Sequence, residues 1–253
     1  MKQDERGPFD EALRVAREAA YDPGEYVEQE SFMRAGEIRA LAERAGIAPG
    51  VSVLDLCCGV AGPGRFITRE LGCSYVGVDS SASAVGIARA RARDLPCRFE
   101  VAHVPPLPPG TFDVVLLLET MLAFPDKESL VEEVARALSA GGRFAFTLEE
   151  GAPLTESERA HMPDADTVWL TPLDEMHTVL ARGGLAVRWQ DDFSRSHRDM
   201  AESLIDAFAA DATDIASRIG GQALDELLAA HRLWSEWLET GRVRKFAIVA
   251  ERS

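Results

Sequence analysis

The sequence predicts an α/β fold in which a doubly wound, mostly parallel sheet of seven strands carries helices on both faces. Three observations support this prediction. Seven short segments with strand character alternate with segments of helical periodicity along the 253 residues. The first strand leads into a turn rich in small residues and then into a helix. The run FDVVLLLE at residues 112–119 is almost wholly apolar, as in strands buried on both faces of a parallel sheet.

The elements follow one another with recognisable boundaries. The predicted strands are short and apolar or alternating, and they cover residues 51–54, 75–78, 97–102, 112–119, 143–148, 185–189 and 242–252. The predicted helices carry apolar residues at helical spacing, and they cover residues 9–20, 31–45, 63–71, 126–139, 171–182 and 199–241. Asp126 is a favourable N-cap residue, and the glycine pairs at 141–142 and 183–184 are typical of helix C-termini.

Residues 51–79 are the most informative part of the chain. The first strand ends at Asp55, and four small residues then follow within six positions, from Gly59 to Gly64. This density demands a sharp turn that points free N–H groups above the sheet. The second strand ends at Asp79, about where an acid accepts hydrogen bonds from both hydroxyls of a ribose. The segment therefore predicts a site for an adenosine.

The position of Asp55 selects among adenosine ligands. An acid ahead of the glycines is unfavourable beside a pyrophosphate, whereas it suits a cationic ligand that has an amino group and no phosphate. The segment DLCCGVAGPG from Asp55 to Gly64, followed by Gly77-Val78-Asp79, resembles the first motif of the class I S-adenosylmethionine-dependent methyltransferases. Cys57 and Ala61 replace two of the family's glycines.

The resemblance implies a Rossmann-like sheet, S-adenosylmethionine as cofactor and S-adenosylhomocysteine as product. It places Asp55 and Gly59 near the methionine end and Asp79 at the ribose. His103 falls where the family has an acid for the adenine amine; its ring would accept from the amine or stack on the base, or it is a loop histidine with no ligand role. The cofactor contacts that we expect are Asp55, Cys57, Gly59, Ala61, Asp79, Ser80, His103, Glu119, Tyr26 and Arg34.

The resemblance also implies a domain organisation. Residues 1–48 are expected to form an N-terminal helical lid, from which Tyr26 and Arg34 reach the methionine end; the alternative is that Tyr26 packs against the sheet and Arg34 is solvated. Residues 49–253 are expected to form the methyltransferase-like domain. They include a substrate-side loop and helix at 149–182 and a helical cap, inserted before the last strand, at 195–241.

Methyl transfer from a sulfonium requires alignment of the acceptor and removal of a proton from a protonated nucleophile. Glu150 and His161, in the loop after the fifth strand, are the catalytic residues that we expect. His177 and His231 fall within helical patterns, which favours packing over catalysis. The expected substrate contacts are Met121, Trp169, His197 and Trp234.

The charge, the lengths of the apolar stretches and the cysteine spacing limit the classes of partner that we expect. A net charge of −15 argues against nucleic acid, because binding a phosphate backbone needs a basic groove. No stretch approaches the roughly 18 apolar residues that span a bilayer, and the N-terminus is polar. We therefore expect a cytoplasmic protein with no membrane partner. We also expect a monomer or a homodimer. The cysteines lack paired C-x-x-C spacing, so we expect no metal site.

The sequence therefore predicts a methyltransferase that acts on an O, N or activated C atom of a small molecule, with secondary metabolites, quinones, amino acids and amines open as acceptors. An alternative is an enzyme of the same fold that binds S-adenosylmethionine or S-adenosylhomocysteine and catalyses a cyclisation or rearrangement without methyl transfer. A nicotinamide-dependent oxidoreductase is disfavoured by Asp55 and by the absence of a G-x-G-x-x-G motif. A non-enzymatic adenosine-binding module leaves the helical cap unexplained.

Overall fold

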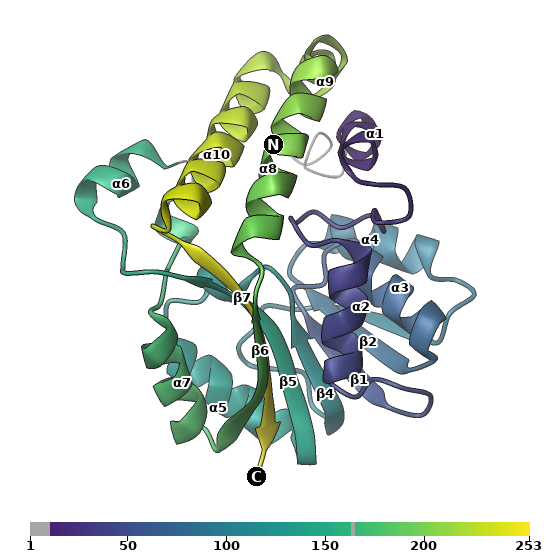
Figure 1. Cartoon of the computed structure of the whole chain (residues 1–253). Coiled ribbons are helices and arrows are strands. Elements are labelled where there is room, and N and C mark those ends of the chain that lie inside the picture. Colours follow the sequence, from purple (N-terminus) through teal and green to yellow (C-terminus); the bar gives the residue numbers. More distant parts are fainter. Residues whose placement is uncertain (1–10, 163–164) are drawn as a thin grey trace.

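The computed structural model describes residues 11–162 and 165–253 (Figure 1). Within them, seven strands form one sheet in the order β3-β2-β1-β4-β5-β7-β6. The strands are β1 Ser52–Leu56, β2 Ser74–Asp79, β3 Cys97–Val101, β4 Phe112–Leu117, β5 Leu138–Glu150, β6 Leu185–Asp192 and β7 Arg244–Arg252. Strands β1 to β5 are parallel, and β7 runs antiparallel between β5 and β6. The predicted doubly wound, mostly parallel sheet is confirmed.

Helices cover both faces of the sheet and one of its ends. The helices are α1 Glu11–Ala20, α2 Ala35–Arg44, α3 Gly62–Leu71, α4 Ala82–Arg91, α5 Lys127–Ala137, α6 Glu156–His161, α7 Leu173–Arg182, α8 Ser194–Ala210, α9 Ala212–Ile219 and α10 Gly221–Thr240, with short 3-10 turns at Met121–Ala123 and Ala165–Thr167. Helices α2, α3 and α4 lie on one face, and α5 and α7 lie on the other (Figure 1). None of the helices formed by the described residues is long and apolar enough to cross a membrane.

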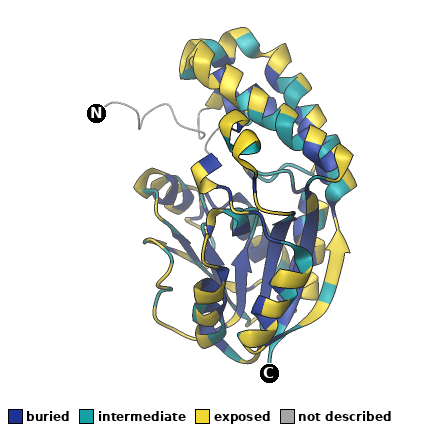
Figure 2. Cartoon of the chain, turned by 90° about the vertical axis from the view of Figure 1, so that its left-hand side faces the viewer, coloured by how far each residue is buried: buried dark blue, intermediate teal, exposed yellow. Residues whose placement is uncertain are grey.

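The core has two layers because the central strands bury both of their faces. Val53, Val114 and Ala145 pack with α2, α3 and α4, whereas Leu54 and Val115 pack with α5 and α7. Figure 2 shows the burial concentrated in the strands, with exposed residues on the outer sides of the helices. The apolar run of β4 thus behaves as its sequence predicts for a strand covered on both sides.

A separate apolar cluster holds the cap above the carboxyl ends of the parallel strands. Helices α8, α9 and α10 pack together and against α1, through residues such as Leu13, Leu204, Phe208, Ile215 and Leu224. In Figure 1 these four helices stand above the sheet. The predicted insertion before the last strand is therefore three helices, and α1 from the N-terminus packs against it.

Some boundaries differ from the sequence predictions for local reasons. Helix α2 begins at Ala35 and not near residue 31, because the Gln29 side chain donates to the carbonyls of Glu25 and Met33 and holds this stretch in a non-helical turn. Strand β5 extends over Leu138–Glu150, because Leu138 pairs with Phe112 of β4 at one end and the pairing with β7 continues to Glu150 at the other. Helix α1 covers the described part of the predicted helix at 9–20; residues 9 and 10 lie outside the described residues.

Candidate functional site

Two cavities meet above the carboxyl ends of the parallel strands. The first, which we call the loop cavity, measures about 260 Å³ and is lined by residues of the loop after β1, the ends of β2 and β4, and the segment 28–33. The second, the cap cavity, measures about 330 Å³ and lies between the sheet and the cap helices. Glu30, Ser31 and Glu119 line both cavities. Ligands in the two cavities would therefore both contact these three residues.

The backbone around the loop cavity is held in unusual conformations. Cys57, Ala61 and Glu119 have left-handed φ angles of 58°, 55° and 59°. Such a conformation costs a residue other than glycine on the order of 1 kcal/mol or more, and it concentrates at functional sites. Cys57 and Ala61 thus keep the backbone turn that glycines would give at these positions. The strain lies at the ends of β1 and β4, where the cavity begins.

Two glycines at the start of α3 allow close packing around this loop. A Cβ atom on Gly62 would lie 2.2 Å from the carbonyl oxygen of Val27, and one on Gly64 would lie 2.2 Å from the ring of Tyr75. The N-terminal segment therefore rests directly on the first turn of α3. The Tyr75 ring passes under the same turn and donates its hydroxyl to Asp55 Oδ2 at 2.5 Å.

The two acids predicted from the sequence are both fixed by hydrogen bonds. Asp79 Oδ2 accepts from the Gly59 N–H at 2.9 Å, and its Oδ1 accepts from the Ser81 N–H at 2.8 Å. Burial raises the pKa of Asp55 from 3.8 to about 7, against the hydrogen bond from Tyr75 and with a smaller contribution from the charge of Asp79. Asp55 is thus a buried carboxyl group that a nearby cation would ionise.

The loop cavity is rich in carboxyl groups. The described residues that line it include no lysine or arginine, and their carboxylates are Glu28, Glu30, Asp55, Asp79 and Glu119. Glu28 is neutralised from outside the lining by ion pairs with Arg65 and Arg91. Burial raises the pKa of Glu30 to about 7, although the charge of Arg17 opposes the shift. Such a lining favours a cationic ligand and disfavours a phosphate-bearing one.

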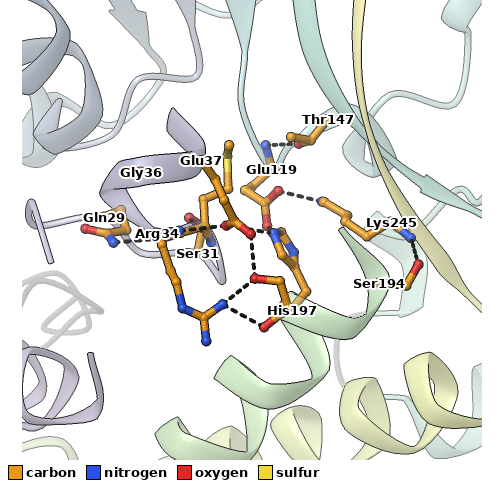
Figure 3. A network of polar contacts seen from close by, with 12 residues as sticks. Gln29, Ser31, Arg34, Gly36, Glu37, Glu119, Thr147, Ser194, His197 and Lys245 are labelled. Carbon is orange, nitrogen blue, oxygen red and sulfur yellow. Dashed lines mark hydrogen bonds and ion pairs between the residues drawn. The ribbon is translucent and has the colours of Figure 1, made fainter. Parts of the chain in front are cut away.

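The cap cavity has a polar floor and a mostly apolar roof. Its roof includes the apolar side chains of Met162, Val168, Trp234 and Leu238, and Arg17 and His231 also line the cavity. Its floor holds Glu119, Glu149, His197 and Lys245, and Figure 3 shows three of these side chains gathered at one place. An apolar molecule that carries a polar group at one end would fit this division.

Lys245 joins two buried carboxylates on the floor. Its Nζ lies 2.7 Å from Glu119 Oε1 and also pairs with Glu149. Burial acts to lower the pKa of Lys245, but the charges of Glu119 and Glu149 outweigh it, and the pKa lies above its ordinary value. The pKa of Glu119 is lowered, because Lys245 and His197 outweigh the effect of its burial. Lys245 and Glu119 therefore carry charges at neutral pH.

His197 lies between two carboxylates in the same network (Figure 3). Its ring is fully buried and lines the cap cavity. Its Nε2 lies 3.6 Å from Glu37 Oε2, and its Nδ1 lies 3.7 Å from Glu119 Oε2. A carboxylate therefore flanks the imidazole on each side.

The structure brings together half of the predicted cofactor residues. Asp55, Cys57, Gly59, Asp79 and Glu119 line the loop cavity. The other predicted contacts lie outside the lining, and they are Ala61, Ser80, His103, Tyr26 and Arg34. Ala61 is the buried cap residue of α3.

Tyr26 and Arg34 have partners elsewhere. The Tyr26 ring packs against Tyr21, with ring centres 5.4 Å apart. Arg34 Nη1 donates to the Ser196 carbonyl oxygen at 2.9 Å. The alternative in which Tyr26 packs against the sheet and Arg34 is solvated does not describe these contacts.

The two predicted catalytic residues point away from the cavities. Glu150 pairs with Arg244 at 2.8 Å, because neighbouring side chains of a strand point to opposite faces and Glu149 faces the cap cavity. His161 is exposed on α6, where its Nδ1 lies 2.7 Å from the Ser157 carbonyl oxygen. The geometry therefore favours Glu149 over Glu150 and His197 over His161 as groups that act on a bound molecule.

The predicted substrate contacts divide in the same way. His197 and Trp234 line the cap cavity. Met121 is buried beneath it, and the next residue, Leu122, lines it instead. Trp169 is 40% exposed and stacks under Arg159, whereas the preceding Val168 faces the cavity.

The family model and two of the relatives that match this chain by sequence are all methyltransferases. Residues 53–142 match the model of a methyltransferase domain. The chain is 29% identical over 181 residues to "Methyltransferase GfsG" of Streptomyces halstedii, covering 66% of this chain and 64% of that protein. It is 37% identical over 111 residues to the sterol 24-C-methyltransferase of Eremothecium gossypii, covering 42% of this chain and 30% of that protein. The matches thus span less than two thirds of these relatives' length.

Solved structures share the whole fold. The cyclopropane synthase MmaA2 from Mycobacterium tuberculosis superposes with a TM-score of 0.83 at 11% identity, covering 96% of this chain and 95% of that one. The [4+2]-cyclase SpnF superposes with a TM-score of 0.75 at 20% identity, covering 95% and 92%. At these identities the likeness establishes the fold, and the chemistry must be argued from the site itself.

Proposed function

Because the chain contains a methyltransferase domain of the class I S-adenosylmethionine-dependent family, we propose that it transfers a methyl group from S-adenosylmethionine to a small molecule held in the cap cavity. The junction of the two cavities at Glu30, Ser31 and Glu119 is the observation that carries this proposal. Methyl transfer is an in-line displacement that needs donor and acceptor in contact, and the junction provides one place for that contact.

The loop cavity suits S-adenosylmethionine by its charge. The cofactor has an ammonium group and a sulfonium centre, and, when bound, it supplies the methyl group from that sulfonium. Asp55 and the other carboxylates of the lining would stabilise these positive charges. Asp79, held at the end of β2 by two backbone N–H groups, would accept hydrogen bonds from the ribose hydroxyls.

His197 is the residue that we assign to proton removal. A hydroxyl acceptor must lose its proton during methyl transfer, and a buried imidazole that lines the cavity is suited to take it. Protonation of His197 places a positive charge between Glu37 and Glu119, and both carboxylates stabilise it. Lys245 is less suited as a base, because its pKa is raised by Glu119 and Glu149.

The walls of the cap cavity indicate the kind of acceptor. Trp234, Leu238 and Val243 offer apolar surface, and Glu119, Glu149, His197 and Lys245 form a polar floor, while Arg17 and His231 are further polar residues of the lining. We therefore propose a mostly apolar acceptor whose hydroxyl group reaches His197. Secondary metabolites and quinones fit this description better than amino acids.

The test is product analysis with labelled cofactor. The purified protein is incubated with S-adenosylmethionine carrying a deuterated methyl group and a library of apolar hydroxyl compounds. We expect a product that has gained the labelled methyl group, with an equal amount of S-adenosylhomocysteine, and loss of both with His197→Gln. A product of unchanged mass, formed without consumption of the cofactor, would instead establish a cyclisation or rearrangement.

A further inference from the structure

Glu37 contributes more to the structure than an ordinary helix cap. It occupies the third position of α2, where a glutamate commonly accepts a hydrogen bond from the cap residue's own N–H. Its Oε2 does accept from the Arg34 N–H at 2.9 Å. Its side chain is nevertheless only 15% exposed, and the same Oε2 lies 3.6 Å from His197 Nε2. A cap alone does not require the carboxylate to be buried against an imidazole.

The other oxygen of Glu37 ties α2 to the cap. Glu37 Oε1 accepts from the Ser196 hydroxyl at 2.5 Å, and Ser196 precedes His197 on α8. Arg34 donates to the Ser196 carbonyl oxygen and also contacts its hydroxyl. The first turn of α2 and the first turn of α8 are therefore joined, although about 160 residues separate them in the chain. This joint brings Glu37 to His197 (Figure 3).

The ring nitrogens of His197 face the carboxylates of Glu37 and Glu119 and are free to bind a ligand. Neither nitrogen has a hydrogen-bond partner of ordinary length among the described residues. The charged groups that face it are Glu37 from α2 and Glu119 after β4, with Lys245 from β7 beside Glu119. The Phe32 ring meets the imidazole edge-on, with centres 6.1 Å apart. A catalytic hydrogen bond that is slightly long without ligand often tightens when the substrate binds.

The neighbours of Glu37 lower its pKa although its burial acts to raise it. Desolvation acts to raise the pKa of Glu37, but His197, Ser196 and the Arg34 N–H together lower it below its ordinary value. Glu37 is therefore an anion at neutral pH. An anion beside Nε2 fixes the orientation of the imidazole and directs Nδ1 towards Glu119 at the edge of the cap cavity.

We propose that Glu37 is a positioning residue for His197: the N-terminal segment supplies the carboxylate that orients the imidazole and stabilises it after it takes the acceptor's proton. The inference rests on the proposed function, in which His197 is the base. Its consequence is that the base is complete only when the first turn of α2 is docked on the cap.

Glu25 provides a matched control. Its Oε2 accepts from the Gly36 N–H at 2.8 Å, so it also stabilises the first turn of α2. Its contact is exposed, and Glu25 does not line either cavity. Glu25→Gln and Glu37→Gln thus remove a carboxylate from the same helix end, and only Glu37→Gln removes one from His197.

The experiment follows the histidine rings of the full chain by ¹⁵N nuclear magnetic resonance as pH is varied, without cofactor or acceptor. The signal of His197 is identified as the one missing in His197→Gln. We expect Glu37→Gln to lower its titration midpoint by about one pH unit or more, as for loss of an opposite charge at this distance. Glu25→Gln should leave it unchanged. Glu37→Asp, which keeps the charge and the cap but shortens the reach, should give an intermediate midpoint and serves if Glu37→Gln does not fold.

The outcomes separate this inference from the proposed function. An unchanged midpoint in folded Glu37→Gln, or in Glu37→Asp if only that variant folds, would overturn the role of Glu37 and leave methyl transfer standing. A lowered midpoint would support the positioning role even if the labelled-methyl assay showed no transfer, because the titration needs no turnover.

Discussion

The buried carboxyl of Asp55 makes the ligand-free protein sensitive to pH, and replacing it with asparagine tests this. The pKa of Asp55 is raised from 3.8 to about 7 in the folded chain. A group whose pKa is raised by folding stabilises the protein below its unfolded pKa, and this contribution is lost as pH rises through the folded pKa. At about 1.4 kcal/mol per pH unit, the loss between pH 4 and pH 8 amounts to about 4 kcal/mol.

Asp55→Asn keeps an oxygen that accepts from the Tyr75 hydroxyl but cannot become charged. We therefore expect the variant to be more stable than the wild type by up to about 4 kcal/mol at pH 8, and by only about 1.6 kcal/mol at pH 5, which is closer to the ordinary pKa of the carboxyl. Urea unfolding of both proteins at the two pH values, after removal of any bound ligand, measures the difference. Asp113→Asn is the control, because hydrogen bonds from Ser52 lower the pKa of Asp113 and its replacement should destabilise the protein at pH 8.

The reasoning would be refuted if Asp55→Asn were equally or less stable at pH 8, or if its effect did not change with pH. The same variant should bind S-adenosylmethionine more weakly, because the cation no longer meets a carboxylate. For the wild type, affinity for this cofactor should rise as pH increases from 6 to 8 and Asp55 ionises. Stability without ligand and affinity for ligand are thus predicted to move in opposite directions.

Three further substitutions test other parts of the site. Lys245→Ala leaves Glu119 and Glu149 buried without their cation and should lower the free energy of unfolding in urea by about 3–5 kcal/mol. A loss below about 1 kcal/mol would speak against a buried charge network. Gly64→Ala places a methyl group in the ring of Tyr75 and should lower both the melting temperature and the cofactor affinity, and normal values for both would contradict the packing. Trp234→Ala should raise the KM for the acceptor and leave the Kd for S-adenosylmethionine unchanged in calorimetry, whereas a weakened cofactor would place Trp234 elsewhere.

The cofactor side could be predicted from the sequence because its determinants are local. Asp55, Gly59 and Asp79 lie within one strand-turn-helix-strand unit, and a parallel pair of strands brings their ends together without further information. The left-handed backbone at Cys57 and Ala61 also agrees with their replacing glycines in the motif. The pattern of small residues and acids predicts the cofactor side of the site because residues close together in the chain form it.

The acceptor side could not be predicted, because it is assembled from distant elements. Glu37, His197 and Lys245 come from α2, α8 and β7, and no spacing in the sequence relates them. The choice between Glu149 and Glu150 depends on which face of β5 points to the cavity, and a shift of one residue reverses it. The loop position of His161 favours it in the sequence, but α6 holds it outside the lining of the cavities.

Calorimetric titration with S-adenosylmethionine, S-adenosylhomocysteine and NADH, on protein stripped of ligands, tests the central claim most directly. We predict micromolar or tighter binding of both sulfur compounds, near −8 kcal/mol, and none of NADH. Asp79→Ala should lose at least about tenfold in affinity, since charge-assisted hydrogen bonds contribute about 1.5–3 kcal/mol each. Folded, empty protein that binds neither sulfur compound, or Asp79→Ala protein that binds as the wild type does, would contradict the account.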